Sequence, residues 1–215
     1  MTVKDFRTLA RDREQRLNSA RPFIRGGAKV VPPENAAGLL YAVIRPGDRV
    51  NIEGNNQKQA IFLAKTLAGL DPARLNRLHM LQSSVVLPEH VAVFDRGIAE
   101  RLDFAFSGPQ AKEIARIVKE KKVKIGAIHT YLELYGRYFV DLTPRVALVA
   151  AELADADGNI FTGYNTEETP TIVEATAFRQ GIVVAQVREV VPRLPRVDIP
   201  GDQVDFVVPC GASPY

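Results

Sequence analysis

The stretch RVNIEGNNQKQAIFLAKTLAGL, residues 49–70, decides the fold of this chain. Residues 49–53 have the pattern of a buried strand, Gly54-Asn55-Asn56 is typical of a tight turn, and residues 57–70 have the apolar spacing of a helix. A strand, a tight turn and a helix in this order make the first half of a βαβ unit. We therefore expect a parallel sheet flanked by helices.

The same alternation of strand and helix patterns continues along the chain. Residues 145–151 and 181–187 are rich in valine and almost continuously apolar, which suits parallel strands buried on both faces. The pattern predicts an open, mostly parallel, doubly wound α/β sheet. The other expected elements are helices over 34–44, 88–101, 110–121 and 170–179, strands over 78–83, 102–106 and 124–128, a hairpin turn at 155–159 and an edge strand over 205–208.

The composition is that of a soluble globular protein, with 215 residues, 46% apolar and 25% charged. No apolar run reaches the roughly 18 residues of a membrane span, and the first residues contain no stretch like a signal peptide. The single cysteine, Cys210, cannot form an internal disulfide and favours a reducing compartment. We therefore expect a cytoplasmic protein that does not bind membranes.

The net charge of +3 is unevenly distributed, because residues 1–29 form a basic N-terminal arm. Such an arm is typical of a solvated helix, but it could also contact nucleic acid, an acidic carrier protein or a neighbouring subunit. No RNA-binding motif with interleaved aromatic residues accompanies it, so nucleic acid is not expected as a partner. The arm contains Lys4, Arg7, Arg11, Arg13, Arg16, Arg21, Arg25 and Lys29 against Asp5, Asp12 and Glu14.

Three polar stretches follow predicted strands, where open α/β sheets bind their ligands. The first, with its glycine and two asparagines, could direct backbone amides and a helix dipole at a phosphate, a carboxylate or the oxyanion of a thioester. The second stretch, at Ser107-Gly108, could equally be an ordinary turn, and His129 of the third stretch could equally be a hydrogen-bonded core histidine. The candidate binding residues are Gly54, Asn55, Asn56 and Gln57, then Ser107 and Gly108, then His129.

Several familiar chemistries leave no signal in this sequence. No HExxH or paired CxxC spacing is present, so no metal site is expected. The GxSxG, GxxxxGK[ST] and GxGxxG motifs are also absent. Glu133, Glu152 and Glu174 have no spacing that supports an acid–base pair. The residues alone therefore indicate a cytosolic doubly wound domain with a polar turn cluster at one edge of its sheet.

Long segments of the chain resemble the alpha subunit of malonate decarboxylase, an acyl-carrier-protein transferase. The citrate lyase alpha subunit is the next relative, and both are similar to class I coenzyme A transferases. The resemblance runs from about Val30 to Val208, and one departure is Asn55, where the family pattern has aspartate. The segments are EGNNQKQAIFLAKTL at 53–67, SGPQAKEIA at 107–115, GAIHTYLELYGRYFVDLTPRVALVAA at 126–151, DADGNIFTGYNTEETPTIVEATAF at 155–178 and VDIPG at 197–201.

The resemblance implies an enzyme that exchanges acetyl for malonyl on the acyl carrier protein of malonate decarboxylase. Residues 30–208 would form a coenzyme A transferase-like half, and residues 209–215 a tail that is either a truncation or a link to a second half. The substrate would be the prosthetic group of the carrier protein, which resembles acyl-coenzyme A, and no covalently bound cofactor is implied. The partners would be the carrier protein and the other decarboxylase subunits, in a homo-oligomer or a larger complex.

In this family a glutamate of the second half attacks the thioester, which is covalent catalysis by a carboxylate. No residue of this chain matches that nucleophile, so we expect no catalytic residue here and no activity from this half alone. Two alternatives are a non-catalytic module that docks the carrier or assembles the complex, and a citrate lyase alpha or general coenzyme A transferase subunit. As a probe of the site, Gly54→Val is predicted to abolish thioester binding while the domain still folds.

Overall fold

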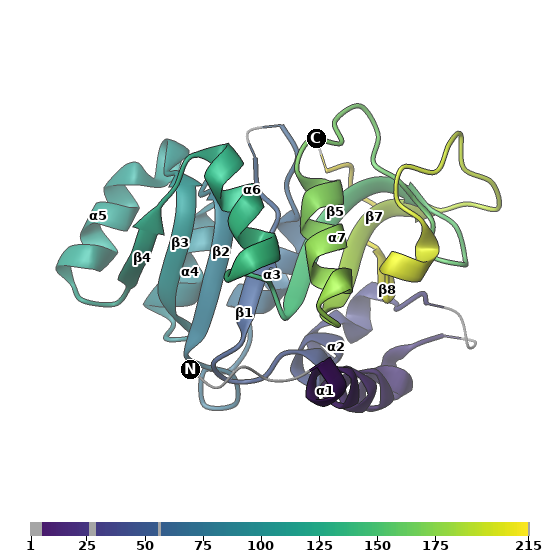
Figure 1. Ribbon diagram of the computed structural model, residues 1–215, viewed down its shortest axis with the longest axis horizontal. Coiled ribbons are helices and arrows are strands. Elements are labelled where there is room, and N and C mark those ends of the chain that lie inside the picture. The colour runs from purple at the N-terminus through teal and green to yellow at the C-terminus, as the bar shows by residue number, and fades with distance from the viewer. Residues whose placement is uncertain (1–5, 26–28, 56, 215) are drawn as a thin grey trace.

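The protein is described by a computed structural model that covers residues 6–25, 29–55 and 57–214. The strands of its sheet are β1 (Arg49–Ile52), β2 (Leu78–Ser84), β3 (Ala99–Phe106), β4 (Lys124–Ile128), β5 (Val146–Ala154), β6 (Ile160–Phe161), β7 (Ile182–Val190) and β8 (Phe206–Pro209). They lie in the order β4-β3-β2-β1-β5-β7-β8 (Figure 1), and β6 pairs with β5 outside this order. Every pairing along that order is parallel, and β6 pairs antiparallel.

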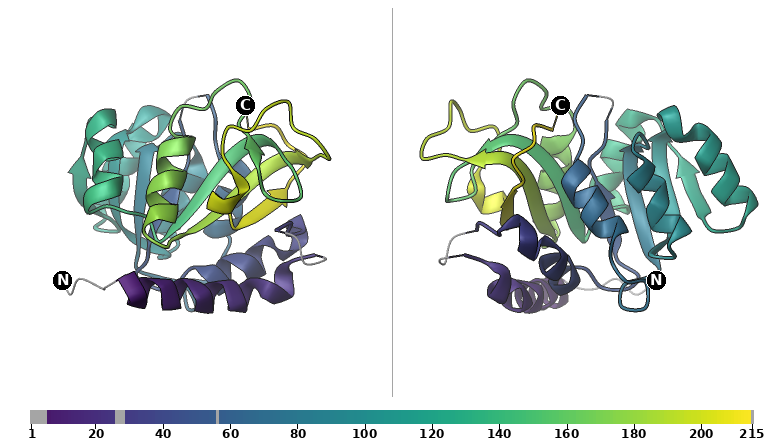
Figure 2. Two further views of the ribbon diagram at one scale, coloured as in Figure 1. Left: turned by 45° about the vertical axis from the view of Figure 1, so that its right-hand side comes forward. Right: turned by 180° about the vertical axis from the view of Figure 1, so that it is seen from behind.

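Helices cover both faces of the sheet (Figure 2). The helices are α1 (Phe6–Ala20), α2 (Ala36–Val43), α3 (Ile61–Ala68), α4 (Pro88–Asp95), α5 (Ala111–Lys119), α6 (Tyr131–Val140) and α7 (Thr169–Phe178), with the short 3₁₀ helices η1 (Arg21–Phe23), η2 (Pro33–Asn35), η3 (Gly108–Gln110) and η4 (Gly201–Gln203). One apolar core lies beneath α2, α3, α4 and α5, and a second lies beneath α6 and α7. Successive strand residues face opposite cores, so that Leu148 belongs to the first and Val149 to the second.

The chain winds in both directions from the centre of the sheet. From β1 it proceeds through β2 and β3 to β4 at one edge, and then crosses to β5, β7 and β8 on the other side. The direction therefore reverses between β1 and β5, which lie side by side with Asn51 opposite Ala147. The prediction of an open, mostly parallel, doubly wound sheet is confirmed, and this reversal locates the crevice where such folds bind ligands.

The observed elements differ from the predicted ones in three places. The helix expected from residue 57 begins at Ile61, because the preceding residues close into a loop through a bridge between Gly54 and Gln59. Helix α4 ends at Asp95 and not at residue 101, since Gly97 has a φ of 77° and terminates it. Helix α6 was not predicted, although Thr130 and Glu133 have the spacing of a capping box and Tyr131, Leu134 and Tyr138 recur at helical spacing.

Helix α1, from the basic arm, packs against the amino-terminal edge of the sheet, at the bottom of Figure 1. The Arg16 guanidinium is buried and donates to Val43 O over 2.6 Å and to Asp48. Arg13 pairs with Asp205, and Asp12 accepts from Arg16, Arg45 and Arg145. Arg13 and Arg16 therefore hold the helix on the domain. The division into an arm, a domain over 30–208 and a tail stays a prediction.

Candidate functional site

The loop from Glu53 to Ala60 leaves the carboxyl end of β1, beside the point where the chain reverses direction. Asn55 organises it, because its Oδ1 atom accepts from the backbone N–H groups of Gln57 and Lys58, both over 2.7 Å. The Asn55 N–H in turn donates to Lys58 O over 3.1 Å. The sequence predicted that amides of this turn would face a ligand, and that prediction is wrong for residues 55, 57 and 58, because their N–H groups are bonded within the loop.

Gly54 is glycine because a buried histidine lies against it. A Cβ atom at this position would lie 2.2 Å from His90 Cε1, far inside van der Waals contact. His90 lies on α4 and is fully buried, and burial lowers the pKa of its imidazole to about 4. The prediction that Gly54→Val leaves the domain folded stays untested, and the structure argues against it, since the added side chain would meet a buried histidine.

A buried ion pair lies under the loop. The Glu53 carboxylate accepts from the backbone N–H of Ala150 over 2.7 Å and from the Thr169 hydroxyl. Lys58 Nζ lies 3.1 Å from the same carboxylate and also donates to Thr169 Oγ1, and the side chains of Glu53 and Lys58 are both 0% exposed. These contacts join β1 and β5 to the first turn of α7. The charges of Glu53 and Lys58 thus compensate each other where water is excluded.

Glu168, directly before α7, is a second buried carboxyl group in this region. It is 0% exposed, and the Ser83 side chain on β2 is a hydrogen-bonding group that acts on its carboxyl and by itself lowers the pKa. Burial and the neighbouring charge of Glu53 raise the pKa of Glu168 to about 8. At neutral pH this carboxyl group therefore holds its proton. The Gln82 side-chain amide, on β2, is buried without a partner in the described part of the chain.

We expect Glu168→Gln to stabilise the protein at pH 8.5 and to change its stability little at pH 5. The folded state holds the Glu168 proton up to about pH 8, whereas an unfolded glutamate releases it near pH 4.3. Wild-type stability therefore falls as pH rises through this interval. The two pKa values differ by more than three units, each worth about 1.4 kcal/mol, so the gain at pH 8.5 should reach roughly 10–20 °C in melting temperature.

Thermal unfolding of Glu168→Gln and wild type at both pH values checks this expectation. The exposed neighbour Glu167 provides the control, because Glu167→Gln should shift the melting temperature by a small and similar amount at both. An equal shift at the two pH values for Glu168→Gln would contradict the assignment of a proton to Glu168.

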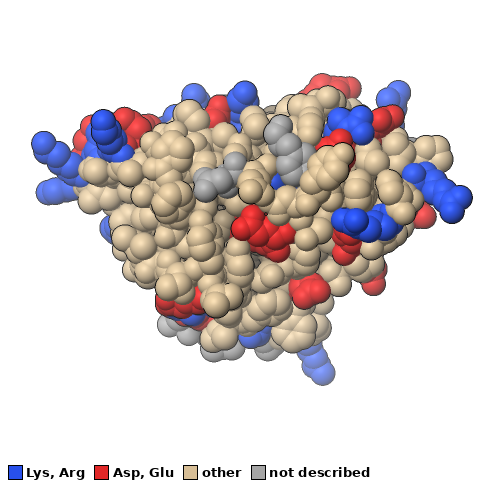
Figure 3. All heavy atoms as spheres, turned by 90° about the horizontal axis from the view of Figure 1, so that it is seen from above, with Lys and Arg blue, Asp and Glu red and all other residues tan. Residues whose placement is uncertain are grey.

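A polar pocket of about 220 Å³ opens above these buried carboxyl groups at the carboxyl edge of the sheet. Asn165 Nδ2 donates to Gln57 Oε1 over 3.1 Å across it, and the Tyr131 hydroxyl lies 2.9 Å from Ser84 Oγ on β2. Figure 3 looks onto this edge, where acidic atoms lie near the centre and most Lys and Arg side chains lie around the periphery. The pocket is lined by Asn55, Gln57, Tyr131, Asn165 and Glu167.

Of the predicted binding residues, Asn55 and Gln57 line this pocket, Gly54 lies buried next to Asn55, and Asn56 lies outside the described residues. Ser107 and Gly108 follow β3, two strands away from β1, and do not line it. Sequence reasoning missed Asn165 and Glu167, which approach from the loop before α7. The only local signal is the acidic pair before Thr169-Pro170, since a helix start favours carboxyl groups.

His129, the remaining predicted residue, is a buried histidine bonded on both sides. Its Nε2 lies 3.0 Å from Asp103 Oδ1 and its Nδ1 lies 3.1 Å from Glu133 Oε1. His79 Nε2 approaches the other Asp103 oxygen at 2.6 Å. Burial alone would raise the pKa of Asp103, but the two histidines outweigh it and lower that pKa to about 2. Both nitrogens of His129 are thus engaged within the protein, and neither faces the pocket.

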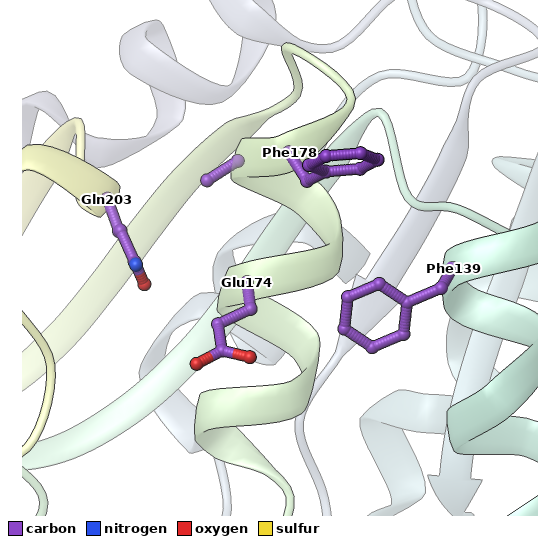
Figure 4. Close-up of a pocket in the computed structure, with 5 residues that line it drawn as sticks. Phe139, Glu174, Phe178 and Gln203 are labelled. Carbon is purple, nitrogen blue, oxygen red and sulfur yellow. The ribbon is translucent and has the colours of Figure 1, made fainter.

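A second hollow, of about 500 Å³, lies over the helices and not at the strand ends. Figure 4 shows Glu174 and Phe178 on α7, with Phe139 from α6 on one side and Gln203 from η4 on the other. Phe178 is 68% exposed, so this is a shallow apolar groove. We place the candidate site in the smaller pocket, because it lies at the reversal point of the sheet and has convergent polar groups.

Neither membrane nor metal features appear in the described ranges. No helix within residues 6–25, 29–55 and 57–214 is long and apolar enough to cross a bilayer. The same residues contain no cluster of three His, Cys, Asp or Glu side chains placed to hold a metal ion.

Comparison with known proteins gives a family match over nearly the whole chain. The family described as malonate decarboxylase, alpha subunit, transporter matches residues 5–215. A curated relative from Malonomonas rubra, acetyl-S-ACP:malonate ACP transferase, is 56% identical over 200 residues, which are 93% of this chain and 36% of the relative. The chain thus spans little more than a third of the length of that relative.

Solved structures agree with this match. The crystal structure of a Pseudomonas malonate decarboxylase hetero-tetramer in complex with malonate contains a chain 50% identical to this one, with a TM-score of 0.93, over 96% of this chain and 38% of that one. A malonate decarboxylase alpha subunit from Acinetobacter baumannii is 44% identical, with a TM-score of 0.92 and the same coverage. Glutaconate coenzyme A-transferase from Acidaminococcus fermentans, 13% identical with a TM-score of 0.67, shares the fold.

Proposed function

The chain belongs to the malonate decarboxylase alpha subunit family, and on that premise we propose that it forms part of a transferase that exchanges acetyl for malonyl on the thiol of an acyl carrier protein. The observation that carries this proposal is the 56% identity to a protein of that activity. Because the chain spans 36% of that relative, the activity is proposed for this chain together with the remainder of such a subunit.

The proposed reaction exchanges one thioester for another. The bond between the acetyl carbon and the carrier sulfur breaks, one carboxyl oxygen of malonate passes to the acetyl carbon so that acetate leaves, and the malonate carboxyl carbon forms the new bond to the sulfur. Atoms and charges balance without an oxidant or a further co-reactant. In class I coenzyme A transferases, which this chain resembles, a carboxylate nucleophile divides such an exchange into two easier steps. We propose that this glutamate lies outside residues 1–215, in the second half of the subunit.

The role proposed for this chain is to form one wall of the reaction cleft. The pocket at the carboxyl edge supplies hydrogen-bonding groups of both kinds from Asn55, Gln57 and Asn165. Beneath it, the Glu53–Lys58 pair and α7 hold the loop in one position. Gly54 contributes through packing against His90. The predicted residues of the other two stretches do not line this pocket. We propose a place in the cleft wall for Ser107, Gly108 and His129 only if the second half of the subunit enlarges the cleft beyond the pocket.

The proposed partners are the acyl carrier protein and the other decarboxylase subunits. A solved malonate decarboxylase is a hetero-tetramer, which supports assembly into a complex. We propose that the substrate presents a prosthetic group like acyl-coenzyme A and that the chain carries no covalently bound cofactor. The single cysteine, Cys210, is the basis for proposing a reducing, cytoplasmic location.

An exchange assay tests the proposed function. The subunit that contains this chain, with its second half, is incubated with acetylated carrier protein and either malonate, citrate or free coenzyme A, and the acyl group on each thiol is identified by mass spectrometry. We expect malonyl carrier and free acetate with malonate alone. Exchange with citrate would instead support a citrate lyase type of subunit, and carrier binding without any exchange would support the docking module.

A further inference from the structure

Asn55 presents a buried hydrogen-bond donor that the protein leaves unused. Its Oδ1 atom is identified by the two backbone N–H groups that donate to it, from Gln57 and Lys58, so its other terminal atom is the Nδ2 amide. The residue is 4% exposed and lines the pocket. Nδ2 has no acceptor among the described residues. Leaving a buried N–H unpaired costs about 1–3 kcal/mol, so an acceptor supplied by a ligand would remove that cost.

The charges around the pocket disfavour an anionic ligand. Its five lining residues include one charged side chain, the carboxylate of Glu167, and no cation. Lys58, below, is fully buried and its ammonium is paired with Glu53. Glu168, beneath the floor, holds its proton at neutral pH and adds no charge of either sign. Malonate, with two negative charges, would be repelled here, whereas a neutral chain of amide and thioester carbonyls would find donors and acceptors on the lining side chains.

We propose that this pocket binds the neutral, carbonyl-bearing arm of the acyl-thioester substrate through the Asn55 Nδ2 donor, and that it excludes free malonate. The proposal rests on the proposed function and adds to it, because it assigns one of the two substrates to this part of the enzyme. The dicarboxylate must then bind elsewhere on the longer subunit.

The substitution Asn55→Asp tests the donor directly. Aspartate keeps the Oδ1 acceptor, and with it the two hydrogen bonds that close the loop, but it replaces the N–H donor by a negative oxygen. With the 215-residue chain and the neutral probe S-acetyl-pantetheine, calorimetry should show affinity reduced by about 10- to 100-fold. Asn18→Asp makes the same change of charge at an exposed position on α1, and should leave affinity unchanged.

Glu167→Gln provides an independent test, because it should raise the affinity for a ligand, whereas Asn55→Asp should lower one. It removes the one charge from the pocket lining, so free malonate should bind at least about three-fold more tightly, while S-acetyl-pantetheine affinity changes little. This variant also decides the proposal if Asn55→Asp lowers the melting temperature enough to obscure its binding. Malonate affinity that is unchanged or weaker in Glu167→Gln would overturn the assigned exclusion.

Kinetics on the complete subunit separate this proposal from the proposed function. We expect Asn55→Asp to raise KM for acetylated carrier by at least about 10-fold and to leave KM for malonate unchanged. If only the KM for malonate rises, or if neither KM changes, the assignment of the pocket is overturned. Exchange by the wild-type subunit would still support the transferase function in that case. If the wild-type subunit shows no exchange, the transferase proposal fails, and the calorimetric comparison of S-acetyl-pantetheine still decides whether Asn55 binds a neutral carbonyl compound.

Discussion

Replacing Lys58 by methionine is expected to lower the free energy of unfolding by about 3–5 kcal/mol, because it leaves Glu53 as an unpaired charge in a site without water. Lys58 and Glu53 are both 0% exposed, and their charged groups lie 3.1 Å apart. The substitution should also disturb the loop around Asn55, because the backbone N–H of Lys58 donates to the Asn55 side chain. Chemical denaturation at pH 7, followed by circular dichroism, measures the change.

Two further variants make this test specific to the ion pair. Lys65→Met removes a lysine from the exposed face of α3 and should change stability by no more than about 0.5 kcal/mol. In the double variant Lys58→Met/Glu53→Gln neither charge of the pair remains. Its loss of unfolding free energy should therefore be smaller than the sum of the losses in Lys58→Met and Glu53→Gln measured separately. A Lys58→Met protein as stable as wild type would show that the pair does not hold the loop.

Gly54→Ala is expected to destabilise the protein by about 2 kcal/mol or more, because the new Cβ would lie 2.2 Å from His90 Cε1. The clash involves a fully buried ring, so relief requires movement of α4 or of the loop itself. Thermal and chemical unfolding give the change in stability. S-acetyl-pantetheine affinity should fall as well, since a displaced loop moves Asn55.

Gly136→Ala is the matched control for this substitution. Gly136 lies within α6, and a Cβ built there meets nothing within 4 Å. The same added methyl group should therefore be neutral or stabilising by up to about 1 kcal/mol, as expected for alanine in a helix. If removing the ring in Gly54→Ala/His90→Ala gave no partial recovery, the contact with His90 would not be the cause of the loss.

The parallel sheet could be predicted from the sequence because its signals are local. Local patterns specify β4 to the residue and the starts of β5 and β7 to within one residue, although both of these strands run three residues beyond the predicted ends. Helix α6 has local signals as well, since Thr130 and Glu133 have the spacing of a capping box and its apolar residues recur at helical spacing, but these signals were overlooked.

The candidate site could be predicted only in part, because its residues meet through long-range contacts. The turn after β1 was recognised from its glycine and asparagines, and Asn55 and Gln57 do line the pocket. The role expected of the turn amides was wrong for Asn55 and Gln57, because their N–H groups are bonded within the loop. Contacts of Lys58 with Thr169, and of Gln57 with Asn165, span more than 100 residues of sequence. No local pattern indicates them.

Side-chain amide resonances offer the most direct measurement of where the thioester arm binds. With ¹⁵N-labelled protein titrated with S-acetyl-pantetheine, we expect the Asn55, Gln57 and Asn165 side-chain signals to shift together and to saturate. The Gln203 amide in the apolar groove should remain in place. Shifts confined to Gln203 and its neighbours, with the Asn55 signal unchanged at saturation, would contradict a binding site at the carboxyl edge between β1 and α7.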